Sequence, residues 1–247
     1  MVKKKKNIKL TALLLTVFLG ALLLGSIWLY KPGLSGTKLK ILNFLPLPIA
    51  TVGGRPVFAH TFFDIKHLLG DQKTLSDGQI YSALLLNEQY AALQDELNIK
   101  PIYGNKQPTN LLEKYDGIKK GLAFYYNSNQ SLNSKNYELA NNIVSRLKQG
   151  ESFESLAKTY SQDLYSKSFG GLTGRNEENI FIPEVEEKIS KISNSQPDII
   201  PSSLGLHIIL RDPENNTVRQ IYLQNSSFEA WLKASAAEIK IKVFIKP

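Results

Sequence analysis

The sequence has 247 residues, of which 43% are hydrophobic and 21% charged, a composition typical of a globular chain with one or two domains. Its formal net charge is +8, but five of these charges are lysines within residues 1–9, and the remainder is too dispersed to indicate a nucleic-acid-binding protein. The chain has no cysteine, which excludes disulfide bonds, thiol catalysis and cysteine-ligated metals.

An uncharged apolar segment, residues 10–30, follows the basic segment 1–9. As a helix rising about 1.5 Å per residue it would span about 31 Å, close to the hydrocarbon thickness of a bilayer. A cleaved signal peptide is the competing interpretation, but its apolar region would be shorter and would end in an Ala-x-Ala-like site, which we do not find. A lipoprotein anchor would need a cysteine. We therefore predict a single-pass, uncleaved transmembrane anchor, with the amino terminus in the cytoplasm and the rest of the chain outside it.

Residues 31–47 are predicted to form a juxtamembrane tether and residues 48–130 a mainly helical domain. The tether is unusually apolar, so we expect it either to pack on the following domain or to lie at the lipid headgroups. The helical domain begins with a strand, a turn at Gly53-Gly54 that needs positive φ angles, and a second short element. Ser76 and Gln79 have the spacing of a capping box, which predicts the start of a long helix. The helices are expected near residues 62–69, 76–98 and 109–126.

Residues 136–247 are predicted to form a second domain, after a polar linker over residues 127–135. Gly150 is suited to end one helix and Ser152 to cap the next. Hydrophobic periodicity predicts helices over residues 137–148, 153–160 and 228–238, and strands over residues 205–209, 218–223 and 239–245.

Several short phrases in this domain together resemble a known family. They are Tyr160-Ser161-Gln162-Asp163, Gly170-Gly171 followed by Gly174, a helix introduced by Ile182-Pro183-Glu184, and Gly205-Leu206-His207-Ile208-Ile209. In this order they resemble the parvulin (PpiC-type) peptidyl-prolyl isomerase domain. The resemblance implies an α+β fold, with a small antiparallel sheet and surrounding helices.

The first strand of that family's domain, of the type Arg-His-Ile-Leu, is missing before residue 137. A similar phrase occurs instead after the module, as Val218-Arg219-Gln220-Ile221-Tyr222-Leu223. We predict a permuted arrangement, in which residues 218–223 take the place of the missing strand.

The strand pair and helices of residues 48–130 are similar to the amino-terminal, substrate-cradling region of SurA-like and PrsA-like chaperones. Val52-Gly53-Gly54-Arg55-Pro56-Val57 loosely matches the Val-x-Gly-x-x-Ile phrase of that region. The resemblance implies a SurA-N-like chaperone domain.

The resemblance implies three catalytic positions, His207, Asp163 and Gln220. His207 matches the histidine of the family's last strand, Asp163 falls where the family has Asp or Cys, and Gln220 stands in place of the first-strand histidine. Strand alternation points His207 away from the apolar side chains of its neighbours. The residues alone leave open a structural His207 and an Asp163 that caps a helix. The implied substrate-binding positions are Ser161, Phe181, Val185, Ser203 and Ile209.

Other candidate residues have structural explanations. Gly170 and Gly171 suit a turn, because no Gly-Lys-Ser/Thr phrase follows that would indicate a phosphate-binding loop. His60 and His67 have no third ligand at metal spacing. We expect no cofactor and no metal ion.

The implied function is that of a membrane-anchored, extracytoplasmic peptidyl-prolyl cis-trans isomerase and chaperone. Its partners would be unfolded or nascent exported polypeptides containing X-Pro bonds and, through residues 10–30, the lipid bilayer. Gln220 and Val185 depart from the family's His and ring-stacking Phe, which favours an alternative, a catalytically inactive holdase or scaffold with the same fold. A third, more remote alternative is a membrane-tethered adaptor that binds no clients.

Overall fold

The computed structural model describes residues 35–45, 47–70, 75–104, 106–175, 180–192, 195–212 and 214–245. The predicted basic segment 1–9 and anchor 10–30 therefore lie outside the described residues. Within the described part of the chain, no helix combines the length and apolarity needed to cross a membrane. The chain divides into two compact units, Met1–Glu88 with Lys240–Pro247, and Gln89–Ile239.

The first unit contains a three-stranded antiparallel sheet in the order β2-β1-β7. Its strands are β1 (Pro48–Val52), β2 (Arg55–Phe58) and β7 (Ile241–Val243). Gly53 and Gly54 form the predicted turn, with φ angles of 55° and 80° that favour glycine. We had assigned the closing strand to the domain at residues 136–247. In the structure β7 instead pairs with β1, and alternation within a strand does not identify its partner.

Three helices accompany this sheet, α2 (Ser35–Leu42), α3 (Ala59–Leu69) and the first part of α4 (Asp77–Glu96). Part of the predicted tether is thus helical, with Leu39 and Leu42 buried. The capping box at the start of α4 is present, since Ser76 N donates to Gln79 Oε1 (2.8 Å) and Gln79 N to Ser76 Oγ (3.3 Å). Tyr81 donates its hydroxyl to Ile245 O (2.8 Å), and burial raises its pKa to about 12.

The second unit contains a four-stranded antiparallel sheet in the order β3-β6-β5-β4. Its strands are β3 (Leu172–Arg175), β4 (Asp198–Pro201), β5 (Gly205–Asp212) and β6 (Thr217–Gln224). Its helices after α4 are α5 (Leu111–Ser128), α6 (Ser134–Lys148), α7 (Phe153–Tyr160), α8 (Leu164–Ser168), α9 (Pro183–Ile189) and α10 (Phe228–Ala237). The mixed α+β character that we predicted is confirmed.

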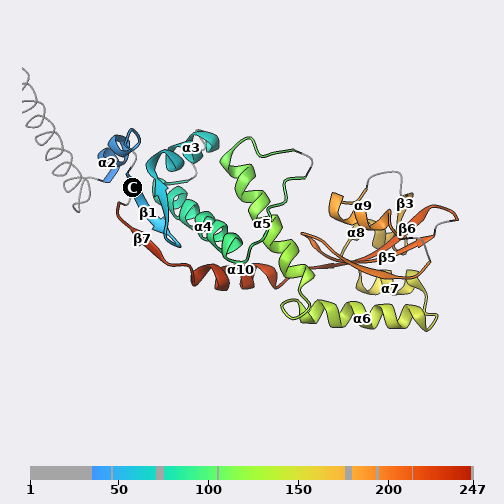
Figure 1. Ribbon diagram of the computed structural model, residues 1–247. Coiled ribbons are helices and arrows are strands. Elements are labelled where there is room, and N and C mark those ends of the chain that lie inside the picture. The colour runs from blue at the N-terminus through green and yellow to red at the C-terminus, as the bar shows by residue number, and fades with distance from the viewer. Residues whose placement is uncertain are drawn as a thin grey trace, which may run out of the picture. The chain divides into compact units, whose positions relative to one another are not determined.

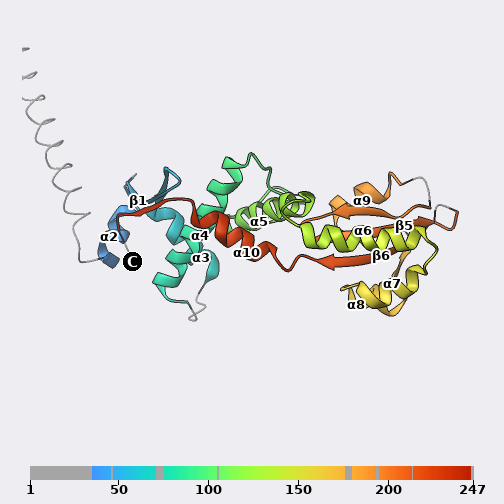
Figure 2. The same cartoon turned by 90° about the horizontal axis from the view of Figure 1, so that it is seen from below.

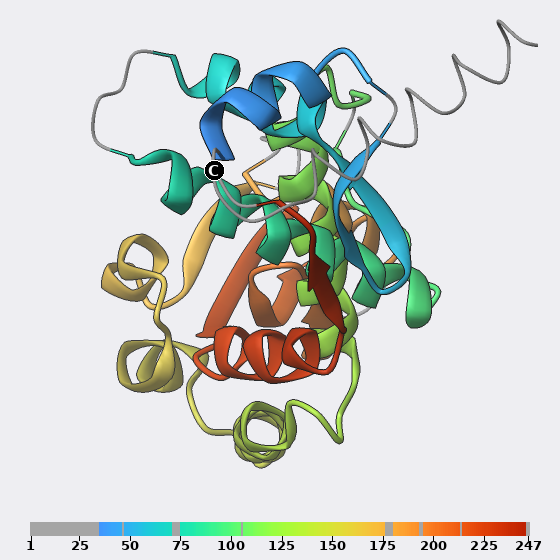
Figure 3. The same ribbon diagram turned by 90° about the vertical axis from the view of Figure 1, so that its left-hand side faces the viewer.

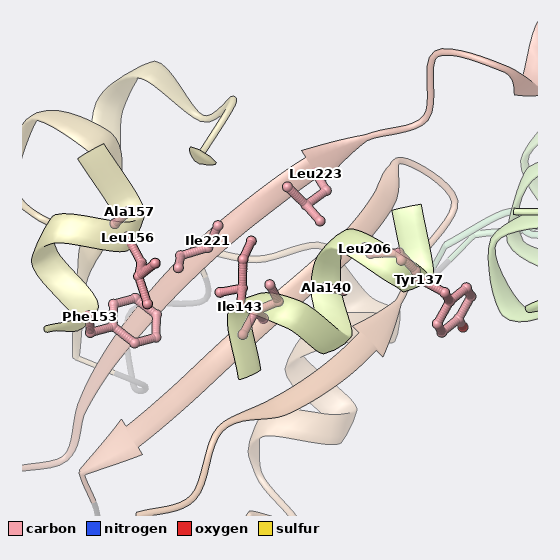
Figure 4. Close-up of a cluster of buried hydrophobic side chains, with 10 residues drawn as sticks. Tyr137, Ala140, Ile143, Phe153, Leu156, Ala157, Leu206, Ile221 and Leu223 are labelled. Atoms are coloured by element: carbon pink, nitrogen blue, oxygen red, sulfur yellow. The ribbon is translucent and has the colours of Figure 1, made fainter. Parts of the chain in front are cut away.

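Different helices cover the two faces of this sheet (Figures 1 and 2). Helices α6 and α7 pack on one face, and Figure 3 shows the yellow-green α6 end-on, below the orange strands of this sheet. Figure 4 shows their shared core, which consists of Tyr137, Ala140, Ile143, Phe153, Leu156, Ala157, Leu206, Ile208, Ile221 and Leu223. Helix α9 packs on the other face. Its Val185 and Ile189 contact the strand residues Ile200, Ile209 and Val218. Each large apolar side chain buried in this way contributes about 1.5–3 kcal/mol, so the central strands are fixed from both sides.

Candidate active site

His207 and Gln220 lie on the two central strands, on the face that α9 covers. In the register of β5 and β6, His207 pairs with Tyr222 and Ile209 with Gln220. His207 Nδ1 lies 3.0 Å from Gln220 Oε1, and Gln220 Nε2 donates to Asp163 Oδ2 (2.9 Å). Both side chains are largely buried, with exposed fractions of 5% and 8%. The structure thus brings the three predicted catalytic positions into one hydrogen-bonded group.

The hydrogen bonds of this group run in one direction. The Asp163 carboxylate can only accept, so the Gln220 amide must turn its Nε2 toward Asp163 and its Oε1 toward His207. Gln220 Oε1 then accepts from His207, which places the imidazole hydrogen on Nδ1. The other ring nitrogen, Nε2, lies 2.8 Å from Ser202 Oγ and accepts a hydrogen bond from the serine hydroxyl. A neutral His207 is therefore held in a single tautomer.

Asp163 is the last residue of the Tyr160–Asp163 motif that follows α7, and it caps the short helix α8. Its Oδ1 accepts from Tyr165 N (3.2 Å), and its Oδ2 accepts from Ser166 N (3.3 Å) and from the Ser166 hydroxyl. Burial alone would raise the pKa of this carboxyl, but the hydrogen bonds from Ser166, Gln220 and the backbone outweigh burial and lower the pKa. Asp163 is thus the ionised acceptor at one end of the hydrogen-bonded chain His207–Gln220–Asp163.

Burial has the opposite consequence for His207, because it disfavours the charged imidazolium. Burial lowers the pKa of His207 below its ordinary value, although the hydrogen bond to Gln220 and the carboxylates of Glu184 and Asp163 oppose this shift. The neutral imidazole is the form that matches the hydrogen bonds described above.

The Gly170-Gly171 turn lets β6 approach α7 and α8 closely. Both glycines have positive φ angles, 63° and 84°, as expected for a turn. Gly171 O accepts from Gln220 N (2.7 Å), and a Cβ atom at Gly171 would lie 2.7 Å from the Phe153 ring and 2.8 Å from Gln220 O. The glycine therefore positions the backbone of Gln220 at the site.

A pocket of about 660 Å³ opens over this group. The Tyr222 ring, 5.0 Å from the His207 ring, forms part of its wall and donates its hydroxyl to Leu204 O (2.8 Å). The lining residues are Gln162, Asp163, Leu164, Tyr165, Thr173, Ile180, Phe181, Ile182, Leu204, His207, Gln220 and Tyr222. Among the described residues of this lining only Asp163 carries a full charge, and most of the others are apolar or aromatic.

The predicted substrate-binding positions occupy different places. Phe181 lines the pocket, whereas Val185 and Ile209 are fully buried in the core beneath it and do not reach the pocket wall. Ser161 is buried and accepts from Tyr222 N (3.1 Å), which ties the end of α7 to β6. Ser203 donates its N–H and hydroxyl to Glu184 Oε1 at the start of α9.

Two residues at the site were not among our predicted positions. Ser202, next to the predicted Ser203, is the serine that contacts His207, and Tyr222 stands beside the His207 ring. Alternation along residues 218–223 could have found Tyr222, because it shares a face with Gln220. No pattern in the sequence distinguishes Ser202 from Ser203. Among the described residues, no three His, Asp or Glu side chains are grouped so that they could hold a metal ion.

Comparison with known families identifies the class of this domain. Residues 118–212 match the family model of the PPIC-type PPIase domain. The matched stretch includes Asp163 and His207 but ends before β6 and therefore before Gln220. The chain thus contains a parvulin-type peptidyl-prolyl isomerase domain.

Two relatives of this chain are foldases. The chain is 42% identical over 71 residues to foldase protein PrsA 2 of Bacillus cereus, a match that covers 28% of this chain and 25% of that protein. It is 34% identical over 98 residues to foldase protein PrsA of Caldanaerobacter subterraneus, covering 38% of this chain and 30% of that protein. The similarity therefore spans between a quarter and a third of each relative's length. No solved structure matches the chain significantly.

Proposed function

We propose that this chain is a membrane-anchored peptidyl-prolyl cis-trans isomerase and chaperone that assists the folding of exported proteins. The observation that carries the proposal is the hydrogen-bonded group His207, Gln220 and Asp163, which lies at the wall of an apolar pocket in a PPIC-type domain. Similarity to foldases supports the same class of client.

The pocket suits the physical demands of prolyl isomerisation. The X-Pro amide must lose its resonance as it twists, against a barrier of about 18–20 kcal/mol. An enclosure that excludes water favours the less polar twisted amide, and oriented polar groups at its wall discriminate between the planar and twisted forms. Phe181, Ile182 and Leu204 provide apolar surface, while Asp163 and Gln220 provide polar groups whose orientation is fixed before any client binds.

The position of β6 supports the permuted arrangement that the sequence predicts. This strand lies beside β5, which carries His207, and it follows the stretch that matches the family model. In our proposal β6 replaces the family's first strand, and Gln220 takes the position of the first-strand histidine.

An exposed apolar rim beside the pocket supports an unfolded polypeptide as the client. Leu164 and Tyr165 on α8 line the pocket yet are 80% and 69% exposed, and Phe169 and Leu204 are also exposed. Apolar side chains gathered in this way are typical of surfaces that bind other chains. The residues flanking the proline of an extended client would contact this rim.

The proposed anchoring in a membrane rests on the apolar sequence of residues 10–30 and the lysines before it. Because the chain has no cysteine, single cysteines report topology without background labelling. We expect Lys233→Cys, on the exposed side of α10, to react with a membrane-impermeant maleimide in intact cells. Lys3→Cys should react only after lysis. The reverse pattern, or two soluble variants, would contradict the anchor.

The activity is tested by adding the full chain, in detergent micelles, to a protein whose refolding is limited by prolyl isomerisation. We expect the slow refolding phase to become faster, and the acceleration to be lost in His207→Ala but kept in the exposed control His67→Ala.

The holdase remains the second candidate, and one observation favours it. Both ring nitrogens of His207 are engaged by protein side chains, as they would be in a purely structural histidine. Suppression of client aggregation with no change in the slow refolding phase would support the holdase. A chain that shows neither effect would be the adaptor.

A further inference from the structure

Asn127 is fully buried in the last turn of α5, at a place where the sequence predicts a polar linker. Its Nδ2 donates to Ser202 O (2.8 Å), and its Oδ1 accepts from Asn133 Nδ2 (3.2 Å) and Asn225 Nδ2 (2.7 Å). Loss of this side chain would leave several buried polar groups without their protein partners. Asn127 is therefore a fixed point among the segments around it.

The orientation of this amide is determined by its partners. The Ser202 carbonyl can only accept, so it must face Asn127 Nδ2. Asn225 Oδ1 accepts from the backbone N–H groups of Ser227 and Phe228, so Asn225 must turn its Nδ2 toward Asn127 Oδ1. One arrangement of donors and acceptors satisfies the whole cluster.

Ser202, which Asn127 holds, is also the serine that contacts His207. Its hydroxyl lies 2.8 Å from His207 Nε2 and accepts from Leu204 N and Gly205 N within the β4–β5 turn. Three side chains hold this turn from outside, Asn127 at Ser202 O, Glu184 at Ser203 and Tyr222 at Leu204 O, and of these only Asn127 binds the Ser202 residue itself. Because Ser202 is fully buried, a shift of its backbone would move the hydroxyl relative to the imidazole.

We propose that Asn127 is a positioning residue of the site, which holds Ser202 so that its hydroxyl donates to Nε2 of His207 and keeps the imidazole in the Nδ1–H tautomer. Asn127 brings together the end of α5, the start of α6 through Asn133, and the segment between β6 and α10 through Asn225. These junctions therefore share one set of hydrogen bonds with the candidate active site.

The test uses the full chain in detergent micelles, labelled with ¹⁵N at histidine. The chain has three histidines, and the other two, His60 and His67, are exposed and serve as internal references. In the wild type we expect Nδ1 of His207 to carry the hydrogen and Nε2 to accept. An Nε2–H tautomer in the wild type would overturn the proposal before any variant is made.

The informative variants are Asn127→Ala and the milder Asn127→Ser. Either should move the Nε2 resonance, because the Ser202 hydroxyl no longer donates to it in a fixed geometry. Loss of this hydrogen bond destabilises the neutral ring and so favours the protonated one. The acid dissociation constant of His207 should therefore fall about three- to tenfold, which corresponds to about 0.7–1.4 kcal/mol. The titratable groups that face the ring, Asp163, Glu184 and Tyr222, are unchanged by these variants.

Asn136→Ala is the matched control. Asn136 Nδ2 also donates to a backbone carbonyl, that of Gln224 (3.1 Å), but it does not touch the β4–β5 turn. We expect the His207 resonances of this control to match the wild type. Ser202→Ala should reproduce the Asn127 effect, and the double variant Asn127→Ala/Ser202→Ala should add nothing further to the His207 shift.

Unchanged His207 resonances in Asn127→Ala or Asn127→Ser, or fully additive effects in the double variant, would refute the proposal. The inference concerns the site of the proposed function, but the imidazole readout does not depend on catalysis. A chain without isomerase activity would therefore contradict the proposed function and leave this test intact.

Discussion

Gln220→Leu removes the side chain that connects His207 to Asp163, with little change in volume. The variant leaves the His207 Nδ1–H group buried without an acceptor, which costs about 1–3 kcal/mol. Asp163 loses one of four hydrogen-bond donors, but it lines an open pocket where water can replace the amide, so this loss adds only about 0.5–1 kcal/mol. The buried leucine offsets up to about 1 kcal/mol through its apolar surface. We therefore expect the β5–β6 region to be destabilised by about 0.5–4 kcal/mol.

Hydrogen exchange of the backbone amides in Gly205–Gln224 measures this loss where it occurs. A single global midpoint would mix the two units of the chain, whereas the slowest amides of β5 and β6 report the opening of this sheet. Gln149→Leu is the control, because Gln149 is exposed beyond the end of α6 and, among the described residues, its side chain bonds only Ser145. A loss below about 0.5 kcal/mol in Gln220→Leu, no larger than that in the control, would refute the assigned hydrogen bonds.

Three further predictions follow from the site and its surroundings. Because the folded-state pKa of His207 is lowered, the unfolded chain binds more protons below about pH 6.5. The stability of the β5–β6 region, measured by hydrogen exchange of its slowest amides, should therefore fall as the pH decreases from 6.5, unless His207 is replaced by Gln. Gly171→Ala should destabilise the same region by about 2–4 kcal/mol, since it combines positive-φ strain with collisions at Cβ. Gly150→Ala, with φ of 90° and open space around it, should cost only about 1–2 kcal/mol in the same hydrogen-exchange measurement. Tyr165→Ser should weaken suppression of client aggregation, and Leu112→Ser, an exposed apolar residue outside the pocket, should leave it unchanged.

Local signals in the sequence predicted several elements well. The helix at residues 153–160 has the expected ends, because Ser152 Oγ accepts from Ser155 N and caps it. His207 lies on a strand beside residues 218–223, as the alternation and the resemblance together predicted. These features depend on neighbouring residues or on a pattern of a few residues, which a single sequence displays directly.

Features that depend on distant residues were not predicted. Helix α8 has only five residues, too few for a periodic pattern, and it forms because Asp163 caps it while Gly170 and Gly171 end it. The pairing of β7 with β1 joins segments near opposite ends of the chain, and alternation alone does not identify a strand's partner. Asn127 has a polar sequence environment, so its burial becomes visible only when Ser202 and Asn225 are brought to it.

Gln220, which the resemblance marked as a departure, is the residue that makes the direction of the hydrogen bonds independent of pH. A histidine at this position could donate or accept through either nitrogen and could gain a proton near neutral pH. An amide cannot titrate, so one end always donates to Asp163 and the other always accepts from His207. The ionised carboxylate at one end and the Ser202 hydroxyl at the other then leave His207 only one neutral arrangement. If β6 replaces the family's first strand as we propose, Gln220 provides a fixed connection where the family has a group that can change protonation state, which is compatible with a reaction that needs no proton transfer.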